Sequence, residues 1–351
     1  MDDLIAVRAD EAFDTEKLSL WMTGIEGLDR GIPRVRQFAG GKANLTYLLT
    51  FTDGSELVLR RPPLGPVAAG SHDMAREYRV LSRLWRSFPK APRALAHCED
   101  ENVIGGQFLL MERRRGVVVR DRVPEAFGGG EDASANRKLS EVVIDTLAEF
   151  HAVDPAECGL DDLGHPDGFL ERQVAGWAVR WERAKDEDYP VADEVAKWLA
   201  ASIPSNGGVT LLHNDWRLDN MAVDASDPGT CTAVYDWDMA TRGDPLADVG
   251  TLMASWYDPG EERSVLSPMP VDAPGWATRK EALKRYGAES GIAMDEIGWY
   301  LVFGTWKLGV VLQQIYIRWL RGQTEDERFR PLGEGARALF RVAAERRQLS
   351  S

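Results

Sequence analysis

The pattern of apolar and polar positions changes several times along the chain, and each change predicts a new element. Residues 14–28 carry apolar side chains at helical spacing and predict a first helix. Alternating or continuous apolar runs then predict antiparallel strands, at 34–38, 45–51 and 56–60. Residues 71–88 return to the helical period and predict a helix that crosses behind this sheet. A further pair of strands, joined by a polar turn, completes a small lobe that ends near Arg115; these strands are expected at 95–98 and 107–112.

The second part of the chain begins after a glycine-rich stretch at 124–133 and is mainly helical in pattern. Apolar spacing and breakers predict its helices, at 135–152, 168–185, 190–202, 245–256, 277–289, 294–321 and 332–348. A short β segment at 220–236 separates the third of these helices from the fourth. We therefore expect a bilobal α+β protein, with a small antiparallel-sheet lobe at 1–115 and a mainly helical lobe at 116–351.

Composition and charge limit the classes of partner. The 351 residues include 42 Lys and Arg against 56 Asp and Glu, a net charge of −14 that argues against docking on nucleic acid or an anionic membrane. The first residues lack a signal-peptide pattern, and no apolar run reaches the ~18 residues of a membrane span. The three cysteines are widely spaced and are expected to be reduced thiols. We expect a cytoplasmic monomer or homodimer.

The segment around residue 215 carries the strongest chemical signal. His213, Asp215 and Asn220 form the pattern HxDxxxxN, and Asp236 and Asp238 follow sixteen residues after the Asn as DxD. This spacing matches the catalytic loop and metal-binding Asp of protein kinases, where one Asp orients the acceptor hydroxyl while an Asn and a second Asp hold Mg²⁺. The competing interpretation is a chance polar loop. The strand context predicted around both motifs favours the phosphotransferase site.

Departures from the protein-kinase pattern indicate a different branch. Asn214 stands where protein kinases have Arg, and Trp237 stands in place of the Phe of DFG. The segment Gly243-Asp244-Pro245-Leu246-Ala247-Asp248 is similar to the GDPxxD segment of the aminoglycoside phosphotransferase family. The sequence therefore resembles that family, and the resemblance implies a bilobal protein-kinase-like fold and an ATP- and Mg²⁺-dependent kinase.

Three further segments resemble a subgroup of that family. They are Leu59-Arg60-Arg61-Pro62-Pro63, the helix with Arg76-Glu77-Tyr78-Arg79, and the stretch from Trp306-Lys307 to Gln323. All three look like the kinase-like domain that is fused to some acyl-CoA dehydrogenases. This resemblance makes a hydroxyacyl-CoA a candidate acceptor. Alternatives are an aminoglycoside or a choline/homoserine-type acceptor, or a non-catalytic nucleotide-binding pseudokinase.

The resemblance also implies roles for the residues of the motif. Asp215 is expected to receive or orient the hydroxyl proton, while Asn220 and Asp236 hold Mg²⁺. Asp238 is either a second metal ligand or a charge that orients the ligands. His213 is either a base or a residue that packs beneath the loop, and the role of Asp215 favours packing. Asp248 is expected to brace the loop by accepting backbone N–H groups.

The small lobe is expected to bind the nucleotide. Gly40, Gly41 and Asn44 lie in a turn that can cover the triphosphate, although an ordinary hairpin has the same appearance. Arg60 stands where the phosphate-binding Lys of kinases is expected, with Arg61 as the alternative. Glu77 falls where the helix glutamate pairs with that cation, unless it is an exposed surface charge.

The last predicted strand of the small lobe leads into a basic segment. Met111, Glu112 and Arg113 are expected to form the hinge, where backbone groups meet the adenine. Five arginines follow closely, at 113, 114, 115, 120 and 122. They are either a solvated rim or a site for an anionic substrate tail, which argues for a hydroxyacyl-CoA over a polycationic aminoglycoside.

Overall fold

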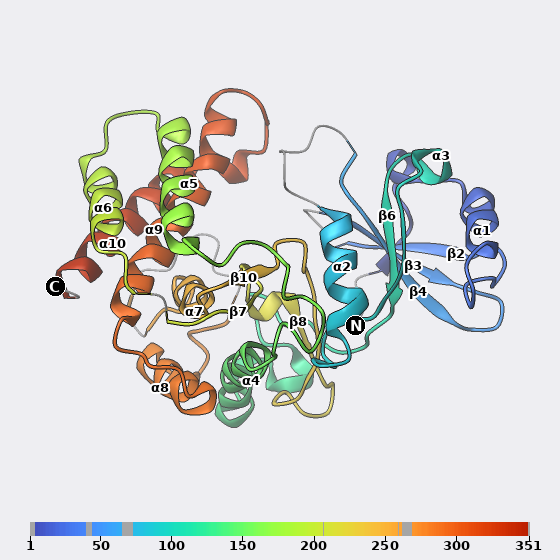
Figure 1. Ribbon diagram of the computed structural model, residues 1–351, viewed down its shortest axis with the longest axis horizontal. Helices are drawn as coiled ribbons and strands as arrows, with labels where there is room; N and C mark the ends of the chain where they lie inside the picture. Colours follow the sequence, from blue (N-terminus) through green and yellow to red (C-terminus); the bar gives the residue numbers. More distant parts are fainter. Residues whose placement is uncertain are drawn as a thin grey trace.

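The chain folds into two lobes, and the N-terminal lobe is built on an antiparallel sheet (Figure 1). The computed structural model describes residues 4–39, 44–64, 73–205, 207–258, 260–261 and 269–349. Within these ranges the sheet has the strand order β1-β2-β3-β4-β6-β5. The strands are β1 (Leu4–Ile5), β2 (Arg34–Phe38), β3 (Leu45–Thr50), β4 (Glu56–Arg61), β5 (Ala94–Cys98) and β6 (Phe108–Glu112).

Alternation along the strands gives the sheet two apolar faces. On β4, Leu57 and Leu59 belong to a core cluster that also contains residues of α1 (Thr15–Thr23) and α3 (Glu101–Ile104). Val58 points the other way and packs with α2 (Met74–Leu84) in the large core that continues into the C-terminal lobe. Because side chains alternate with period two, neighbouring residues of β4 face different cores.

The C-terminal lobe is mainly helical, and four helices gather at the end of the lobe away from the sheet: α5, α6, α9 and α10 (Figure 1). The helices are α4 (Ala133–His151), α5 (Phe169–Ala184), α6 (Pro190–Ala201), α7 (Leu246–Met253), α8 (Arg279–Ser290), α9 (Ile297–Leu320) and α10 (Leu332–Leu349). Two short antiparallel pairs lie between α6 and α7: β7 (Thr210–Leu212) with β10 (Thr241–Gly243), and β8 (Met221–Val223) with β9 (Cys231–Val234). No helix of the described residues is long and apolar enough to cross a bilayer.

The chain passes between the lobes just after β6. That strand ends at Glu112, and Val117 already exchanges two backbone hydrogen bonds with Val223 of the C-terminal lobe, at 2.8 and 3.0 Å. A second link joins the Val234 N–H to the Lys90 carbonyl, at 2.8 Å. The expected boundary near residue 115 lies between Glu112 and Val117.

The α+β bilobal architecture is confirmed, and the differences from expectation are local. The polar turn predicted after β5 contains α3, which Asp100 caps and Gly105 ends with φ 84°. The single β segment expected at 220–236 is the β8–β9 hairpin. The β7–β10 pair was not predicted, because strands of three residues leave no measurable period.

Helices α7 and α9 cross with almost no space between them. A Cβ atom placed on Gly304 would lie 2.1 Å from the Gly250 carbonyl oxygen. Both positions therefore require glycine, because any side chain would push the two helices apart. This contact determines which residues of α9 reach the loop in front of α7.

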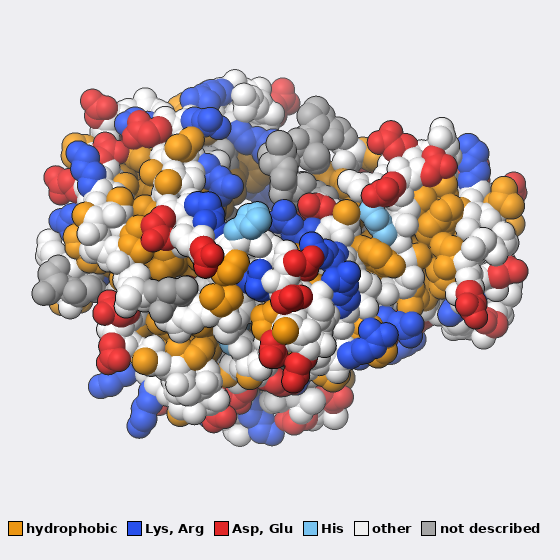
Figure 2. Space-filling view, in the orientation of Figure 1, with side chains coloured by type: hydrophobic (Ala, Val, Ile, Leu, Met, Phe, Trp, Pro, Cys, Tyr) orange, Lys and Arg blue, Asp and Glu red, His pale blue; other side chains and the backbone are white. Residues whose placement is uncertain are grey.

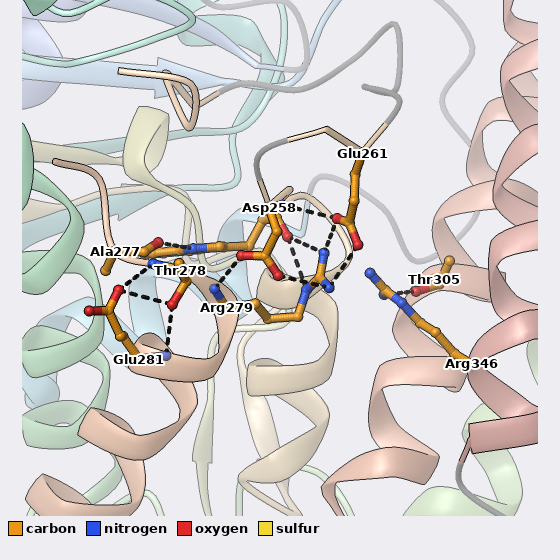
Figure 3. Close-up of polar contacts among 9 residues, drawn as sticks. Asp258, Glu261, Ala277, Thr278, Arg279, Glu281, Thr305 and Arg346 are labelled. Carbon is orange, nitrogen blue, oxygen red and sulfur yellow. Dashed lines mark hydrogen bonds and ion pairs between the residues drawn. The ribbon is translucent and has the colours of Figure 1, made fainter. Parts of the chain in front are cut away.

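The start of α8 carries a capping box, which allows a direct stability test (Figure 3). The Thr278 hydroxyl accepts from the Glu281 N–H, and the Glu281 carboxylate accepts from the Thr278 N–H at 2.8 Å. We expect Thr278→Ala to lower the free energy of unfolding by about 1 kcal/mol, because the Glu281 N–H loses its partner. Urea denaturation should show a lower midpoint with an unchanged slope, and Thr278→Ser should restore it. An unchanged midpoint for Thr278→Ala would contradict this role.

Candidate active site

The loop after β7 is held by a buried carboxylate. Asp248 on α7 accepts the His213 N–H at 2.7 Å and the Asn214 N–H at 2.8 Å, as the sequence predicted for a brace. Asn214 has φ 66°, a left-handed conformation that Asn adopts more readily than most residues. Burial raises the pKa of Asp248, but hydrogen bonds and the nearby His151 and His213 rings outweigh this effect and hold the pKa below its usual value. The brace is therefore ionised under ordinary conditions.

Aromatic side chains form the floor beneath this loop. Trp216 stacks on Phe150, and Trp237 contacts Phe150 and His213 at ring distances of 5.1 and 4.8 Å. The two indoles also donate to backbone carbonyls, Trp216 to Val143 at 3.0 Å and Trp237 to Val234 at 2.8 Å. Each tryptophan follows a candidate catalytic or metal-binding aspartate in sequence. Burial of the indole thus anchors the acidic residue before it.

His213 has both ring nitrogens engaged within the protein. Its Nε2 lies 2.8 Å from the Tyr235 carbonyl oxygen, and its Nδ1 accepts the Asp215 N–H at 3.3 Å. The ring is fully buried. This arrangement is that of a packed residue beneath the loop, and it leaves no ring nitrogen for an acceptor hydroxyl.

Asp215 and Asn220 are joined directly. The Asn220 Nδ2 donates at 2.9 Å to both the carboxylate and the backbone carbonyl of Asp215. With its amide nitrogen used in this way, Asn220 retains its carbonyl oxygen as a possible metal ligand. Arg217 also contacts Asp215, at 3.4 Å, and Asp219, at 3.1 Å. Sequence reasoning missed Arg217, although Asp215 and Asp219, two positions before and after it, could have indicated that it pairs with them.

Asp236 is presented by a strained backbone and paired with a cation. Its φ is 69°, a conformation found at few non-glycine residues and concentrated at functional sites. Its carboxylate forms an ion pair with the Arg60 guanidinium. Burial opposes ionisation of Asp236, but Arg60 and His213 outweigh it and lower the pKa. Asp238 accepts from the Asn44 Nδ2 at 3.3 Å, which ties this segment to the start of β3.

Arg60 and Arg61 point to opposite faces of the sheet. The Arg60 Nε lies 3.0 Å from the Glu77 carboxylate on α2, whose side chain is buried. Burial raises the pKa of Glu77 to about 7 against the pull of Arg60. Arg61 instead donates to the Ile104 carbonyl at 2.8 Å on the α3 side. The geometry therefore selects Arg60 over Arg61 as the cation that faces Asp236, and Glu77 is not a surface charge.

A pocket of about 380 Å³ opens between the lobes at this point. Met111, Glu112 and Arg113 all line it, at the end of β6. Its apolar wall comes from both lobes and includes Phe38, Val58, Leu81, Met111 and Val117. Its charged lining includes the paired Arg60, Glu77 and Asp236, and further charged residues: Asp219, Glu112, Arg113, Arg114 and Arg120. An apolar slot bordered by charged groups suits a flat base with a polyphosphate tail. Gly40 and Gly41 lie outside the described residues.

The arginines after the hinge have partners. Arg113 and Arg115 both contact the Glu56 carboxylate at 2.6 Å. Arg114 contacts Glu112 at 2.8 Å and donates to the Pro89 carbonyl at 2.7 Å. Figure 2 shows basic and acidic side chains interspersed where the two lobes meet. These contacts hold Arg113, Arg114 and Arg115 within the protein, with Arg113 buried and Arg115 exposed, and they do not favour a site for a substrate tail. Arg120, from the same basic segment, lines the pocket.

The oxygen donors suit a hard divalent cation. Asn220, Asp236 and Asp238 offer one amide oxygen and two carboxylates, the ligand type that Mg²⁺ prefers when phosphates and waters complete its shell. Among the described residues no group of three or more His, Cys, Asp or Glu could hold a metal without such help. The donor set thus fits a cation that arrives with a nucleotide.

The Asp248 brace allows a second test. We expect Asp248→Asn to lower the free energy of unfolding by about 1–3 kcal/mol, because an amide has a single acceptor oxygen for the two loop N–H groups. The lowered pKa of Asp248 means that its contribution is present above the ordinary carboxyl range and is lost as pH falls. Acid unfolding profiles should therefore converge for the two proteins at low pH. A constant difference at every pH would contradict the role of the charge.

Comparisons with known proteins identify the family of the chain. The model of the phosphotransferase enzyme family matches residues 34–280. Among curated proteins, the chain is 28% identical to acyl-CoA dehydrogenase family member 10 of Mus musculus, over 96% of this chain and 31% of that protein. It is 29% identical to acyl-CoA dehydrogenase family member 11 of Gallus gallus, over 92% of this chain and 42% of that protein. The chain thus spans less than half the length of these relatives.

Among solved structures, the chain is similar to a putative aminoglycoside phosphotransferase of Ralstonia eutropha. The TM-score is 0.82 at 29% identity, covering 96% of this chain and 99% of the other. A choline kinase of Cryptosporidium parvum shares the fold, with a TM-score of 0.61 at 12% identity and 96% of each chain covered. The two-lobed architecture is therefore that of the kinase-like phosphotransferases.

Proposed function

The chain belongs to the phosphotransferase enzyme family, and from this membership we propose that it is an ATP- and Mg²⁺-dependent kinase for a hydroxyl group of a small molecule. One observation carries the proposal. Arg60 and Asp236, which come from distant parts of the chain, pair in the wall of the pocket. Asp215 is joined to Asn220, whose backbone carbonyl accepts the N–H of Tyr235, the residue before Asp236. A protein that bound a nucleotide without transfer would not require an acidic residue beside the metal ligands.

The residues of the site have separate tasks in this mechanism. The apolar wall holds the base, and Arg60 binds phosphate oxygens while Glu77 keeps its guanidinium in place. Asn220 and Asp236, with Asp238 beside them, are the groups that would hold Mg²⁺. When bound, this ion supplies charge neutralisation on the phosphates.

Asp215 acts on the acceptor. The acceptor oxygen forms a bond to the γ-phosphorus as the bond to the bridging oxygen of ADP breaks, and the hydroxyl proton passes to the Asp215 carboxylate. Asn220 and Arg217 hold that carboxylate in place. The products are ADP and a phosphate ester. Positioning supplies most of the effect, because phosphoryl transfer needs little covalent help from the protein.

The relatives support one class of acceptor. Those reported above are acyl-CoA dehydrogenase family members, and this chain matches one segment of each. A hydroxyacyl-CoA is the acceptor that best fits these relatives. An aminoglycoside is the alternative, suggested by the similarity to the putative aminoglycoside phosphotransferase of Ralstonia eutropha. The net charge of −14 does not decide between them.

A substrate panel tests the proposal. Purified protein with Mg-ATP should release ADP with 3-hydroxybutyryl-CoA, and the signal should require both Mg²⁺ and the hydroxyl, with butyryl-CoA as the matched control. Kanamycin, choline and homoserine form the other arms. Turnover of kanamycin and of no other compound in the panel would make an aminoglycoside the acceptor class in place of a hydroxyacyl-CoA. Tight Mg-ATP binding without transfer to any hydroxyl compound would favour the pseudokinase.

A further inference from the structure

Lys307 on α9 is a buried cation that the nucleotide site does not use. Its residue is 8% exposed, and within the described part of the chain it forms no ion pair. Among the described residues, the Nζ atom has one hydrogen-bonding contact, a long one of 3.5 Å to the Thr251 hydroxyl. The indole of Trp177 lies on another side, 5.4 Å from the Nζ to the ring centroid. An ammonium can donate three hydrogen bonds, and burying one without a counter-ion is costly unless a ligand meets it.

The packing of α9 brings this cation to the catalytic loop. Lys307 lies one turn after Gly304, at the tight crossing with α7. On α7, Thr251 lies one turn after Asp248, the brace of the loop that carries Asp215. Burial lowers the pKa of Lys307, while the carboxylates of Asp248 and Asp215 act in the opposite direction. Through its contact with Thr251, the ammonium lies against α7, the helix whose Asp248 holds the loop that carries Asp215.

Lys307 and Arg60 are influenced by different acidic groups. The acidic groups that act on Arg60 are Glu77, Asp236 and Asp238. Those that act on Lys307 are Asp248 and Asp215. Arg60 pairs with Asp236 in the pocket wall, whereas Lys307 contacts Thr251 on α7, one turn after the residue that holds the loop carrying Asp215.

Two half-buried arginines of this lobe lie at a cluster of acidic residues. Arg279 contacts Asp258 at 3.4 Å and pairs with Glu261, and the Arg346 guanidinium donates to Thr305 near this group (Figure 3). The two carboxylates explain these arginines as structural. In the described part of the chain the Lys307 ammonium contacts a hydroxyl and an indole but no carboxylate, so its charge can take a further partner.

We propose that Lys307 binds an acyl oxygen of the acceptor, a carboxylate or thioester carbonyl close to the hydroxyl that is phosphorylated, and thereby selects hydroxylated acyl compounds over cationic acceptors. The inference rests on the kinase function proposed above and adds a residue to it. An acyl oxygen satisfies the donors of the ammonium and orients the hydroxyl toward Asp215. A cationic acceptor would meet a like charge in a dry site, which is strongly unfavourable.

The test is Lys307→Met, which keeps an unbranched side chain of nearly the same length and removes its charge. We expect the KM for 3-hydroxybutyryl-CoA to rise at least tenfold, while the KM for Mg-ATP stays within twofold. Lys307→Arg should recover part of the loss. Thermal unfolding should show a folded variant with an equal or higher Tm, because a buried unpaired charge is removed. Lys284→Met, the same change at an exposed position of α8, is the matched control.

The choice of acceptor identifies the group that is bound. Weaker binding of both 3-hydroxybutyrate and its CoA thioester in Lys307→Met places the ammonium on the oxygen that the two share. Weaker binding of free 3-hydroxybutyrate, with unchanged binding of its CoA thioester, places the ammonium on a carboxylate. An unchanged KM for every acyl acceptor, or a wild-type preference for choline that the variant keeps, overturns the inference.

Calorimetry separates this inference from the proposed function. If wild-type protein binds Mg-ATP but phosphorylates nothing, the kinase proposal fails. Titration with 3-hydroxybutyryl-CoA then still decides about Lys307. Binding by the wild type and at least tenfold weaker binding by Lys307→Met supports an acyl site, and equal binding by the two proteins refutes it.

Discussion

Replacing Asp215 by Asn is expected to lower kcat by a factor on the order of 10² to 10⁴, the range that a positioned acid–base group supplies. The amide cannot take the hydroxyl proton, yet it has the same shape and can keep the contact from the Asn220 Nδ2 at 2.9 Å. The KM for Mg-ATP should therefore change little, since Asp215 is not part of the pocket wall. The measurement is steady-state ADP release with the best acceptor of the panel.

The control for this experiment is Asp161→Asn, an identical change at an exposed position. Its kcat should equal that of the wild type. Calorimetry should show that Asp215→Asn still binds Mg-ATP, which separates a chemical defect from a folding defect. A kcat within threefold of the wild type would remove Asp215 from the role of proton acceptor.

Sequence patterns predicted most of the elements because long helices and alternating strands have clear periods. The same alternation shows why Arg60 and Arg61 must face opposite cores, but it does not say which core faces the cleft. That answer depends on α2, whose Glu77 contacts Arg60, and on α3, whose Ile104 carbonyl receives Arg61. Tertiary packing of two helices decided a choice that local pattern left open.

The HxDxxxxN and DxD motifs predicted a candidate catalytic loop for a different reason. Their spacing reflects chemistry that needs particular residue types close together, so the motif carries information that periodicity lacks. The aromatic floor under the loop was not predicted as a unit. Trp216 and Trp237 flank the two key aspartates in sequence, but their common contact with Phe150 arises only when α4 packs beneath them.

Lys307 shows the limit of reading a sequence alone. The Trp306-Lys307 pair was noticed as part of a resemblance, and nothing in its neighbourhood connects it with Asp215. The connection comes from the contact of Gly250 with Gly304, which brings α9 against α7. The period of apolar residues does not predict where small residues let two helices cross, although such a crossing determines which side chains meet.

Replacing Asp236 by Asn should remove the Mg²⁺ dependence of nucleotide binding. Asn tolerates the φ of 69° at this position, so the backbone is expected to survive the change while the negative charge is lost. Loss of one partner of a desolvated charge pair costs about 2 kcal/mol or more, on the order of thirtyfold in the Kd of Mg-ATP. Arg60 remains paired with Glu77, so ATP without metal should bind the variant at least as well as the wild type.

The two titrations, with Mg²⁺ and with a chelator, are run by calorimetry beside Asp227→Asn, whose carboxylate lies on the surface against Lys138. Asp238→Asn in the same series distinguishes the two roles of Asp238. If Asp238 is a second metal ligand, this variant loses the Mg²⁺ dependence of nucleotide binding as Asp236→Asn does. If Asp238 only orients the ligands, the loss is smaller. Equal Mg-ATP affinity in Asp236→Asn and wild type would move the metal away from this residue, and the assignment of Arg60 to the phosphates would then lose the partner that positions it.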